Sequence, residues 1–299
     1  MRKRRSIRPS TVIIICSLLA LAVALVLKYK SSTSPVTKFV DEHGQEIISF
    51  TSHENVSYPI HRPQKNHTQQ FFHISSKEMA VLPHSSAIPL WGTLRVPAGK
   101  QFKIVLADST LIWLNAETTI RFPYGTPQQF REVFIEGEAF VQPSLREQPF
   151  IMHAGYVNIK MDSGMCNINT YTTGITEVAM LAGNMRISNG QQVANPTAGT
   201  TIRSEHDKDL ELYRLHNLYV TTWMQGQMYF EHAPLKQLVA PVKRWYNTAM
   251  IFDDLRLEKE TFSATLDITE PLDSFLLDLT KTTPIKTYKE DGIIHIARK

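Results

Sequence analysis

Three adjoining segments decide the fold of the central region: Phe102-Lys-Ile-Val-Leu106, Ala107-Asp-Ser-Thr110 and Leu111-Ile-Trp-Leu114. The first and third are short apolar runs with a period close to two, which is typical of β-strands. The middle segment places Asp108-Ser109 where a hairpin turn needs Asp or Gly. The stretch therefore predicts two strands joined by a tight turn.

The same pattern extends outward from this stretch, between Leu90 and about Ile202. Gly, Pro, Asn or Asp separates most of the runs, and no segment keeps a period of 3.6 over three turns. The further runs are Val133-Phe-Ile135, Glu138-Ala-Phe-Val141, Phe150-Ile-Met152, Tyr156–Met161, Cys166–Tyr171, Ile175–Met180 and Asn184–Ile187. Many short strands of this kind predict an all-β sandwich, barrel or roll over residues 91–202.

The periodicity changes again toward the C-terminus. Residues 203–227 are expected to be a connector that contains Trp223. Residues 228–299 then predict a compact α+β unit with the element order β-α-β-β-α-β-β.

Prolines and one turn sequence set the expected boundaries inside this unit. Pro234 and Pro271 stand where the first residues of two amphipathic helices are expected. Pro241 falls inside the first helix and should kink or shorten it. Glu290-Asp-Gly292 predicts the turn of a closing hairpin.

The N-terminal region contains an uncharged apolar run from Val12 to Leu27. As a helix it reaches about 24 Å, the lower end of what a hydrocarbon core of about 30 Å accepts. Five of the first ten residues are basic and none is acidic, which places the N-terminus in the cytoplasm. We expect a cytoplasmic tail at 1–10 and a single transmembrane helix at 11–27, with the bulk of the chain across the membrane. A cleaved signal peptide is the main alternative, although no small-x-small cleavage site follows Leu27.

The net positive charge of the chain comes from the basic residues that flank the apolar run. The chain has 32 Lys and Arg, 28 Asp and Glu, and a net charge of +4. Seven basic residues flank the apolar run, so the remainder is slightly acidic, and the composition does not favour nucleic acid as a partner. Cys16 would lie in the membrane and Cys166 beyond it, so no intrachain disulfide is expected.

Residues 28–90 are rich in Pro, Ser, Thr and Gln and poor in apolar runs. They predict a mobile spacer with one ordered strand near Phe71 to Ile74. Six histidines fall in this segment at scattered spacing, and we interpret them as solvated rather than as metal ligands.

Four motifs in the β region are similar to those of the FecR family of membrane-anchored regulators. They are Val96-Pro-Ala-Gly99, Leu106-Ala-Asp-Ser-Thr110, Trp113-Leu-Asn-Ala116 and Phe134-Ile-Glu-Gly-Glu-Ala-Phe140, followed by Pro149-Phe150. Further on, Phe230-Glu-His-Ala-Pro-Leu235 and Arg244-Trp-Tyr246 resemble the C-terminal STN-like domain of Bacteroidetes-type FecR-like proteins. The two resemblances cover residues from about 90 to 298 in the order usual for the family.

The resemblance implies a location and a set of partners. FecR-like proteins are single-pass inner-membrane proteins whose periplasmic part senses a TonB-dependent outer-membrane transporter through its signalling domain. They pass the signal to an extracytoplasmic-function sigma factor, which they antagonise or help to activate. The family's sigma-binding domain precedes the membrane span, whereas ten residues are expected there in this chain. An upstream start, loss of that domain and action through another membrane partner are the alternatives.

A second departure concerns self-cleavage. Some family members are cut at a Gly-Thr step by using the Thr hydroxyl as a nucleophile. The matching stretch here is Met161 to Ile168, in which Met165 follows Gly164 in place of Thr. Because a thioether has no nucleophilic oxygen, we expect no self-cleavage at Gly164. Cys166 is interpreted as a small buried apolar residue.

The sequence predicts no catalytic, cofactor-binding or metal-binding residues, and no cofactor. Glu136 and Glu138 are two residues apart and would share a strand face, as paired catalytic carboxylates could. The family resemblance nevertheless points to a regulator that is not an enzyme. Trp113, Phe134 and Phe140 are expected in the core. For the regulator, strand addition at an edge of the C-terminal sheet is the expected mode of contact. The alternative function is an exported, membrane-anchored module that binds a glycan or a protein surface.

Overall fold

The computed structural model describes residues 38–60, 71–84, 90–125, 131–215 and 218–299. From Phe39 onward the chain forms one compact unit. The predicted cytoplasmic tail at 1–10 and transmembrane helix at 11–27 lie outside the described residues. Within the described ranges, no helix is both long and apolar enough to cross a membrane.

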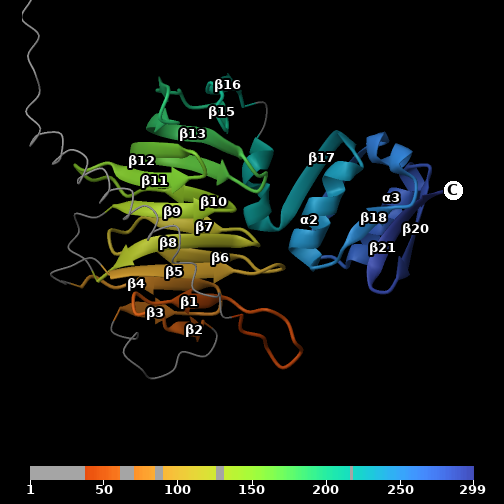
Figure 1. The fold of residues 1–299 in the computed structure, drawn as a ribbon, viewed down its shortest axis with the longest axis horizontal. Helices are drawn as coiled ribbons and strands as arrows, with labels where there is room; N and C mark the ends of the chain where they lie inside the picture. The colour runs from red at the N-terminus through yellow and green to blue at the C-terminus, as the bar shows by residue number, and fades with distance from the viewer. Residues whose placement is uncertain (1–37, 61–70, 85–89, 126–130, 216–217) are drawn as a thin grey trace, which may run out of the picture. The chain divides into compact units, whose positions relative to one another are not determined.

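Residues 39–214 form the β domain, which contains one sheet of 16 strands (Figure 1). The main path of the sheet runs β2-β1-β5-β8-β9-β11-β12-β10-β7-β6-β4-β3, and β13 to β16 branch from β12. The first eight strands are β1 (Ser49–Thr51), β2 (Ser57–Pro59), β3 (Phe72–Ile74), β4 (Glu78–Val81), β5 (Leu90–Val96), β6 (Phe102–Val105), β7 (Leu111–Leu114) and β8 (Thr118–Tyr124). The others are β9 (Glu132–Glu136), β10 (Glu138–Gln142), β11 (Phe150–Ala154), β12 (Val157–Asn169), β13 (Ile175–Ser188), β14 (Val193–Ala194), β15 (Thr200–Glu205) and β16 (Glu211–Arg214).

The sheet curls until the two ends of its main path meet. Phe50 of β1 and Phe72 of β3 pack edge to face, with 4.8 Å between ring centroids. Gly92 of β5 leaves room for the Phe50 ring, because a Cβ at that position would lie 2.3 Å from it. The closed sheet surrounds a core of apolar side chains from nearly every strand. The prediction of an all-β domain is therefore confirmed, and the curled sheet is a roll.

The expectation of a mobile spacer over residues 28–90 is wrong for much of its described part. The expected strand near Phe71 to Ile74 is present as β3, but β1, β2 and β4 lie in the same segment and join the large sheet. His53 is part of this structure, since its Nδ1 lies 2.7 Å from the Tyr124 hydroxyl. These strands have only three or four residues each, too few for a periodic signal, and contacts with distant strands stabilise them.

The turn between β6 and β7 is held by a buried ion pair. Asp108 accepts hydrogen bonds from the backbone N–H and the hydroxyl of Thr110, each at 2.9 Å. Arg131 Nε donates at 2.7 Å to Asp108 Oδ2, the oxygen that also accepts from the Thr110 hydroxyl, and both side chains are buried. The predicted β6–β7 hairpin is present, and the Asp is a structural anchor as well as a turn former.

The β domain also extends beyond its predicted end at residue 202. β16 pairs with β15, and the 3₁₀-helix η1 (Leu218–Gln225) follows, so the predicted connector 203–227 is partly regular structure. All four residues of β16 are exposed, and an exposed strand of this kind gives no alternating apolar signal.

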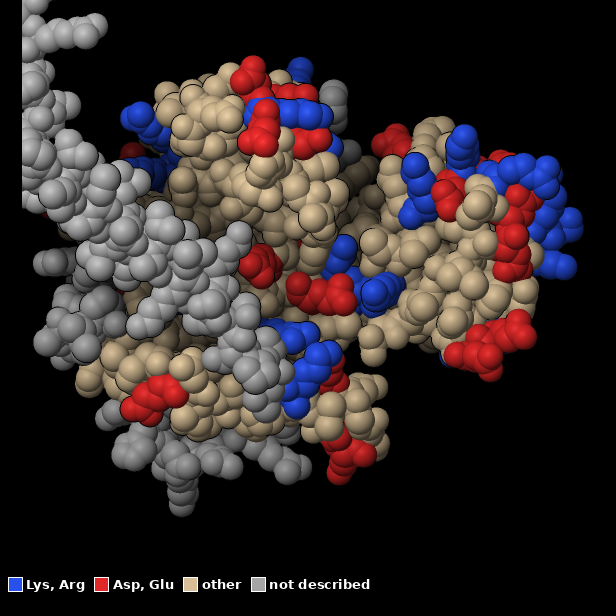
Figure 2. All heavy atoms as spheres, viewed as in Figure 1, with Lys and Arg blue, Asp and Glu red and all other residues tan. Residues whose placement is uncertain are grey.

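The C-terminal module comprises β17 (Gln227–Pro234), α2 (Lys236–Tyr246), β18 (Met250–Phe252), η2 (Leu255–Lys259), β19 (Thr261–Asp267), α3 (Leu272–Thr282), β20 (Ile285–Glu290) and β21 (Ile293–Arg298). Apart from the 3₁₀-helix η2, this is the element order expected from the sequence. The strands form two sheets, β17-β19 and β18-β21-β20. Acidic and basic side chains are interspersed on the face shown in Figure 2.

The structure corrects the expected role of Pro234 and shows that Pro241 does not end α2. Pro234 is the last residue of β17, and α2 begins two residues later. Pro241 lies inside α2 without ending it. Leu238, Val242 and Trp245 are buried on the same helix, and this packing offsets the missing backbone hydrogen bond. The helix α3 starts directly after Pro271, as expected.

Candidate functional site

A buried carboxylate lies where the β domain meets the C-terminal module. The Glu138 side chain is buried and accepts hydrogen bonds from the amides of Asn115 at 2.8 Å, Asn167 at 3.0 Å and Asn169 at 3.2 Å. Burial raises the pKa of Glu138, whereas the amides of Asn115 and Asn167 act in the opposite direction. A carboxylate with three amide donors is a satisfied polar group, and it orients those amides rigidly.

The oriented amides bind two tryptophans from beyond the β domain. Trp245 of α2 donates from its indole Nε1 to Oδ1 of Asn115 at 3.2 Å. Trp223 of η1 donates in the same way to Oδ1 of Asn167 at 3.0 Å. We call Glu138, Asn115, Asn167, Trp223 and Trp245 the junction network. The Trp113-Leu-Asn-Ala116 motif therefore supplies Asn115, the acceptor for Trp245, and the Phe134–Phe140 motif supplies Glu138, which accepts from the amides of Asn115 and Asn167.

Backbone contacts and apolar side chains complete the junction. The backbone N–H of Gly99, in the Val96–Gly99 motif, donates to the Arg244 carbonyl at 2.9 Å. Ala116 and Phe140 of the β domain belong to the same apolar cluster as Trp245 and the core of the C-terminal module. The module is therefore docked through a continuous interior that contains both apolar and polar contacts.

The three aromatic residues expected in the core have different positions. Phe140 is buried, and Trp113 packs against it edge to face at 5.5 Å. Phe134 of β9 is only half-buried, and its ring stacks on that of His153 in β11 with 4.5 Å between centroids. The core prediction is therefore wrong for Phe134. An alternating strand has two faces, and both faces carry aromatic residues here.

Glu136 and Glu138 do not form a carboxylate pair. Gly137 separates strands β9 and β10 with a φ of +109°, and the change of direction leaves Glu136 exposed while Glu138 is buried. A Cβ at Gly137 would lie 2.6 Å from the Thr118 hydroxyl oxygen, so the position requires glycine. The idea of shared catalysis by these two residues fails on geometry. Among the described residues, no three His, Cys, Asp or Glu side chains gather as metal ligands.

The stretch that corresponds to the family's cleavage step is a continuous strand. Gly164 lies within β12 opposite Gly183 of β13, and a Cβ at either would lie 2.0 Å from a backbone oxygen of the other strand. Cys166 is fully buried, and burial raises the pKa of its thiol to about 12. The interpretation of Cys166 as a small buried apolar residue is confirmed.

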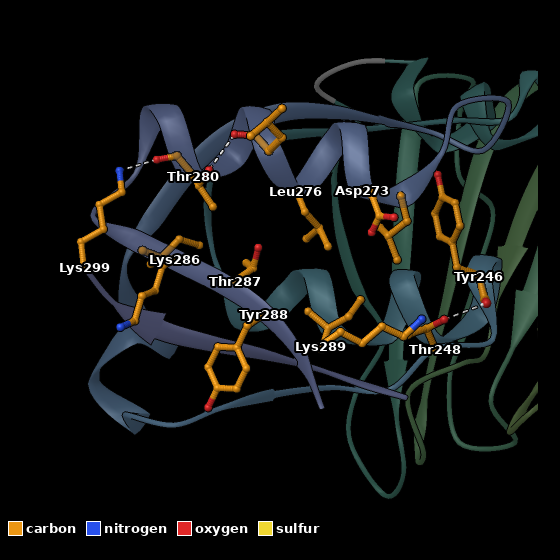
Figure 3. A pocket seen from close by; sticks show the side chains of 14 residues that line it. Tyr246, Thr248, Asp273, Leu276, Thr280, Lys286, Thr287, Tyr288, Lys289 and Lys299 are labelled. Atoms are coloured by element: carbon orange, nitrogen blue, oxygen red, sulfur yellow. Dashed lines mark hydrogen bonds between the residues drawn. The ribbon is translucent and has the colours of Figure 1, made fainter. Parts of the chain in front are cut away.

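A groove runs between β20 and α3 on the C-terminal module (Figure 3). Its volume is about 570 Å³, and five consecutive residues of β20, from Ile285 to Lys289, line one wall. Because successive side chains of a strand point to opposite faces, a wall of five consecutive residues runs along the edge of the strand. Leu276, Leu277 and Thr280 of α3 contribute to the other wall.

The β20 edge is unpaired within the described part of the chain. In the sheet order β18-β21-β20, β20 pairs with β21 alone. Lys286 and Lys289 line the groove, and neither takes part in an ion pair with a described residue. Leu277 is 58 % exposed and Tyr288 is 43 % exposed. The groove thus combines backbone hydrogen-bonding groups, apolar surface and positive charge.

Residues of the junction network and of the groove were missed as site residues by the sequence prediction. Arg244 and Trp245 belong to a motif already recognised, and a Trp in an amphipathic helix beside a basic residue was the available signal. Asn115, directly after β7, and Asn167, inside β12, gave a weaker signal, since a buried amide is unusual unless its hydrogen bonds are satisfied. Nothing local identifies their partners.

Comparison with known protein families divides the chain into two matched regions. The FecR protein family matches residues 92–191, and the family "FecR, C-terminal" matches residues 227–296. Together the matches span more than half of the chain. The chain belongs to the FecR family. A comparison with curated protein sequences finds no significant match.

Two solved structures share the fold. Both are crystal structures of a Parabacteroides distasonis protein described as a candidate anti-sigma factor, at 2.50 Å and 1.65 Å resolution. The first is 24 % identical with a TM-score of 0.62, and the match covers 70 % of this chain and 99 % of that chain. The second is 23 % identical with a TM-score of 0.61, covering 69 % and 99 % respectively.

Proposed function

We propose that this protein is a membrane-anchored FecR-type regulator that transmits a signal from an outer-membrane TonB-dependent transporter toward an extracytoplasmic-function sigma factor. In this proposal residues 11–27 form the inner-membrane anchor and the residues that follow lie in the periplasm. The FecR domain and the FecR C-terminal domain support it, as do the two structures described as a candidate anti-sigma factor. The basic residues before the apolar run support the orientation.

The observation that carries the proposal is that the C-terminal module has two different surfaces, one bound to the β domain and one with an unpaired strand edge. One side of the module is fixed to the β domain through Trp245 and Asn115. The β20–α3 groove, by contrast, has an unpaired strand edge. The groove is therefore the receiving surface in this proposal, and a strand of the transporter's signalling domain adds to β20. Because the junction network fixes the C-terminal module to the β domain, a change in the module on binding is passed to the β domain.

A transcriptional experiment tests the receiving surface. Transcripts that change when the gene is deleted are measured in cells that carry Leu277→Glu with Lys289→Glu. The groove variant should lose the response to the transporter's substrate, as should a deletion of residues 228–299. The deletion alone is a weak test, because it also exposes Phe140 and Ala116 of the shared core.

A matched control separates the groove from general damage to the module. Leu255 is 72 % exposed on η2 and Lys236 is exposed on α2, and neither lines the groove. Leu255→Glu with Lys236→Glu makes the same chemical changes and should keep the response. If the groove variant responds as the wild type does, the groove is not the receiving surface.

The location is tested separately. An alkaline phosphatase fused after Lys299 should be active, and the fusion should stay with the inner membrane after a salt wash. Recovery of the uncleaved chain from the cytosol would contradict the proposed anchor. In-cell crosslinking followed by mass spectrometry identifies whether the sigma factor is bound directly or through another membrane protein.

The alternative of a glycan-binding module would need an exposed aromatic platform. Tyr219 and Tyr229 are 44 % and 38 % exposed, and their rings are stacked at 4.6 Å with an interplanar angle of 18°. Each ring thus covers one face of the other, which reduces the platform that a sugar could use. The pair lines a cavity with a different chemistry.

A further inference from the structure

A second cavity, of about 730 Å³, lies beside the junction network. Its walls come from both parts of the protein. Asn169, Tyr171 and Glu177 belong to the β domain, whereas Tyr229 and Arg244 belong to the C-terminal module. Anything bound there contacts both domains at once.

The Arg244 side chain gives this cavity its chemistry. The residue is only 8 % exposed, and its guanidinium lies 3.5 Å from the centre of the Tyr171 ring. Burial raises the pKa of Glu138, and the positive charge of Arg244 is one of the smaller effects that oppose this shift. The Arg244 Nε is buried and has no hydrogen-bond partner among the described residues.

A buried arginine with an unpaired N–H is stabilised by a hydrogen-bond acceptor. The guanidinium carries five N–H donors in a fixed plane, and a buried charged donor without a partner is strongly unfavourable. Such planes match carboxylates, which accept two parallel hydrogen bonds. Charged neighbours narrow the choice of anion. Glu177 and Glu231 also line the cavity, and Glu177 is already paired with Arg203 at 3.1 Å.

We propose that this cavity binds a small organic monocarboxylate, with Arg244 as the anion-binding residue and Tyr219 and Tyr229 packing against the body of the ligand. Because Arg203 pairs with Glu177, Arg244 remains to balance one negative charge, and the second carboxylate, Glu231, disfavours a phosphate dianion. Met228 and Phe230 add apolar wall next to the tyrosines. The site goes beyond the proposed protein contact at β20, since the two surfaces share no residues. Because its walls come from both domains, bound carboxylate stabilises the junction.

The test uses the full chain, purified in detergent, and three probes of similar shape: benzoate, benzamide and phenyl phosphate. Nuclear magnetic resonance follows the Arg244 Nε–Hε signal, which is assigned by its loss in Arg244→Gln. Benzoate should shift this signal and raise the thermal midpoint in proportion to its concentration. Benzamide lacks the charge and should do neither, and phenyl phosphate should bind more weakly than benzoate.

Variants decide whether the effect belongs to this cavity. Arg244→Gln should weaken benzoate binding on the order of tenfold or more. Arg186 is exposed on β13 and does not line the cavity, so Arg186→Gln should leave binding unchanged. Arg244 also supports Tyr171, so the first variant could unfold. Tyr229→Ala, at a position 38 % exposed, should also weaken binding, whereas Tyr156→Ala, at a position 49 % exposed and outside the cavity, should not.

Three results would overturn the inference. The first is an Arg244 signal that does not move at a large excess of benzoate, which would mean that the cavity holds water only. The second is an equal response to benzoate and benzamide, which would remove the role of charge. The third is equal benzoate affinity in the wild type, Arg244→Gln and Tyr229→Ala. None of these results bears on the transcriptional test of the β20–α3 groove.

Discussion

The indole Nε1 of Trp245 donates a hydrogen bond of 3.2 Å to Oδ1 of Asn115, a residue 130 positions earlier in the chain. The same Asn115 donates from its amide nitrogen to Glu138. One side chain thus joins the C-terminal module to the buried carboxylate of the β domain. The relative orientation of the two domains depends on this link, and its strength is measurable.

Replacing Trp245 with Phe should lower the free energy of unfolding by about 1–2 kcal/mol. The ring keeps most of its packing, but the indole hydrogen bond, worth about 1 kcal/mol, is lost together with some buried area. Denaturant unfolding of the full chain measures the change. Trp91 is half-buried on the outer face, under Arg121, and Trp91→Phe should have a smaller effect. Equal effects would show that the junction bond does not contribute.

Glu138→Gln should remove a pH dependence of stability. Burial raises the pKa of Glu138 above its ordinary 4.5, so the folded protein holds this proton more tightly than the unfolded chain does. The contribution is fully present below pH 4.5 and is lost as pH rises through the raised pKa. As pH rises through this window, the free energy of unfolding should fall more steeply for the wild type than for Glu138→Gln. Parallel curves would contradict the burial argument.

Asp108→Ala should destabilise the β domain by about 3–5 kcal/mol. The substitution leaves the Arg131 charge buried without its carboxylate partner, and such losses are among the largest for single ion pairs. The control is Asp278→Ala, which breaks an exposed pair with Lys281 and should change stability by less than about 1 kcal/mol. Thermal unfolding of both variants gives the comparison.

Gly164→Ala should destabilise the protein strongly, by about 3 kcal/mol or more. Gly164 has a φ of +122°, and an added Cβ would lie 2.0 Å from the Ala182 carbonyl oxygen. Ser163→Ala changes the neighbouring position without a new contact and should alter stability by about 0.5 kcal/mol at most. A tolerated alanine at 164 would mean that β12 and β13 separate locally at little energetic cost.

The chain should also stay intact at Gly164. Met165 follows it inside the continuous strand β12 and supplies no hydroxyl for an acyl shift. An immunoblot with antibodies to both ends should show one product. Two stable fragments that meet near residue 164, and that persist in a protease-deficient strain, would contradict this expectation.

Sequence patterns could predict those features that depend on neighbours along the chain. The β6–β7 hairpin follows from alternation and from Asp108-Ser109, and the α3 start follows from Pro271. The pairing of β1 with β5 could not be predicted, because three residues show no period and Phe50 is buried only when the sheet closes. Local rules also mislead at Pro241, where burial of Trp245 and Val242 outweighs the missing hydrogen bond.

The site was harder to predict than the fold for a related reason. The Phe134–Phe140 motif was recognised, but its Glu138 acts through Asn115 and Asn167, which lie 23 and 29 residues away. Spacing along a strand suggested that Glu136 and Glu138 share a face, and the bend at Gly137 separates them. Which side of a motif meets another domain is a property of long-range packing, and composition does not encode it locally.

The closure of the roll has a mechanical consequence. β1 is the first strand of the described chain and is held to β5 by three residue pairs. Tension applied at Phe39 therefore loads β1 before any longer strand. Peeling these three residues away would withdraw Phe50 from Phe72 and Tyr124 and open the core at its seam. A pull on the N-terminal side of the roll is thus converted into unlatching of the sheet, while the C-terminal docking surface lies on other strands.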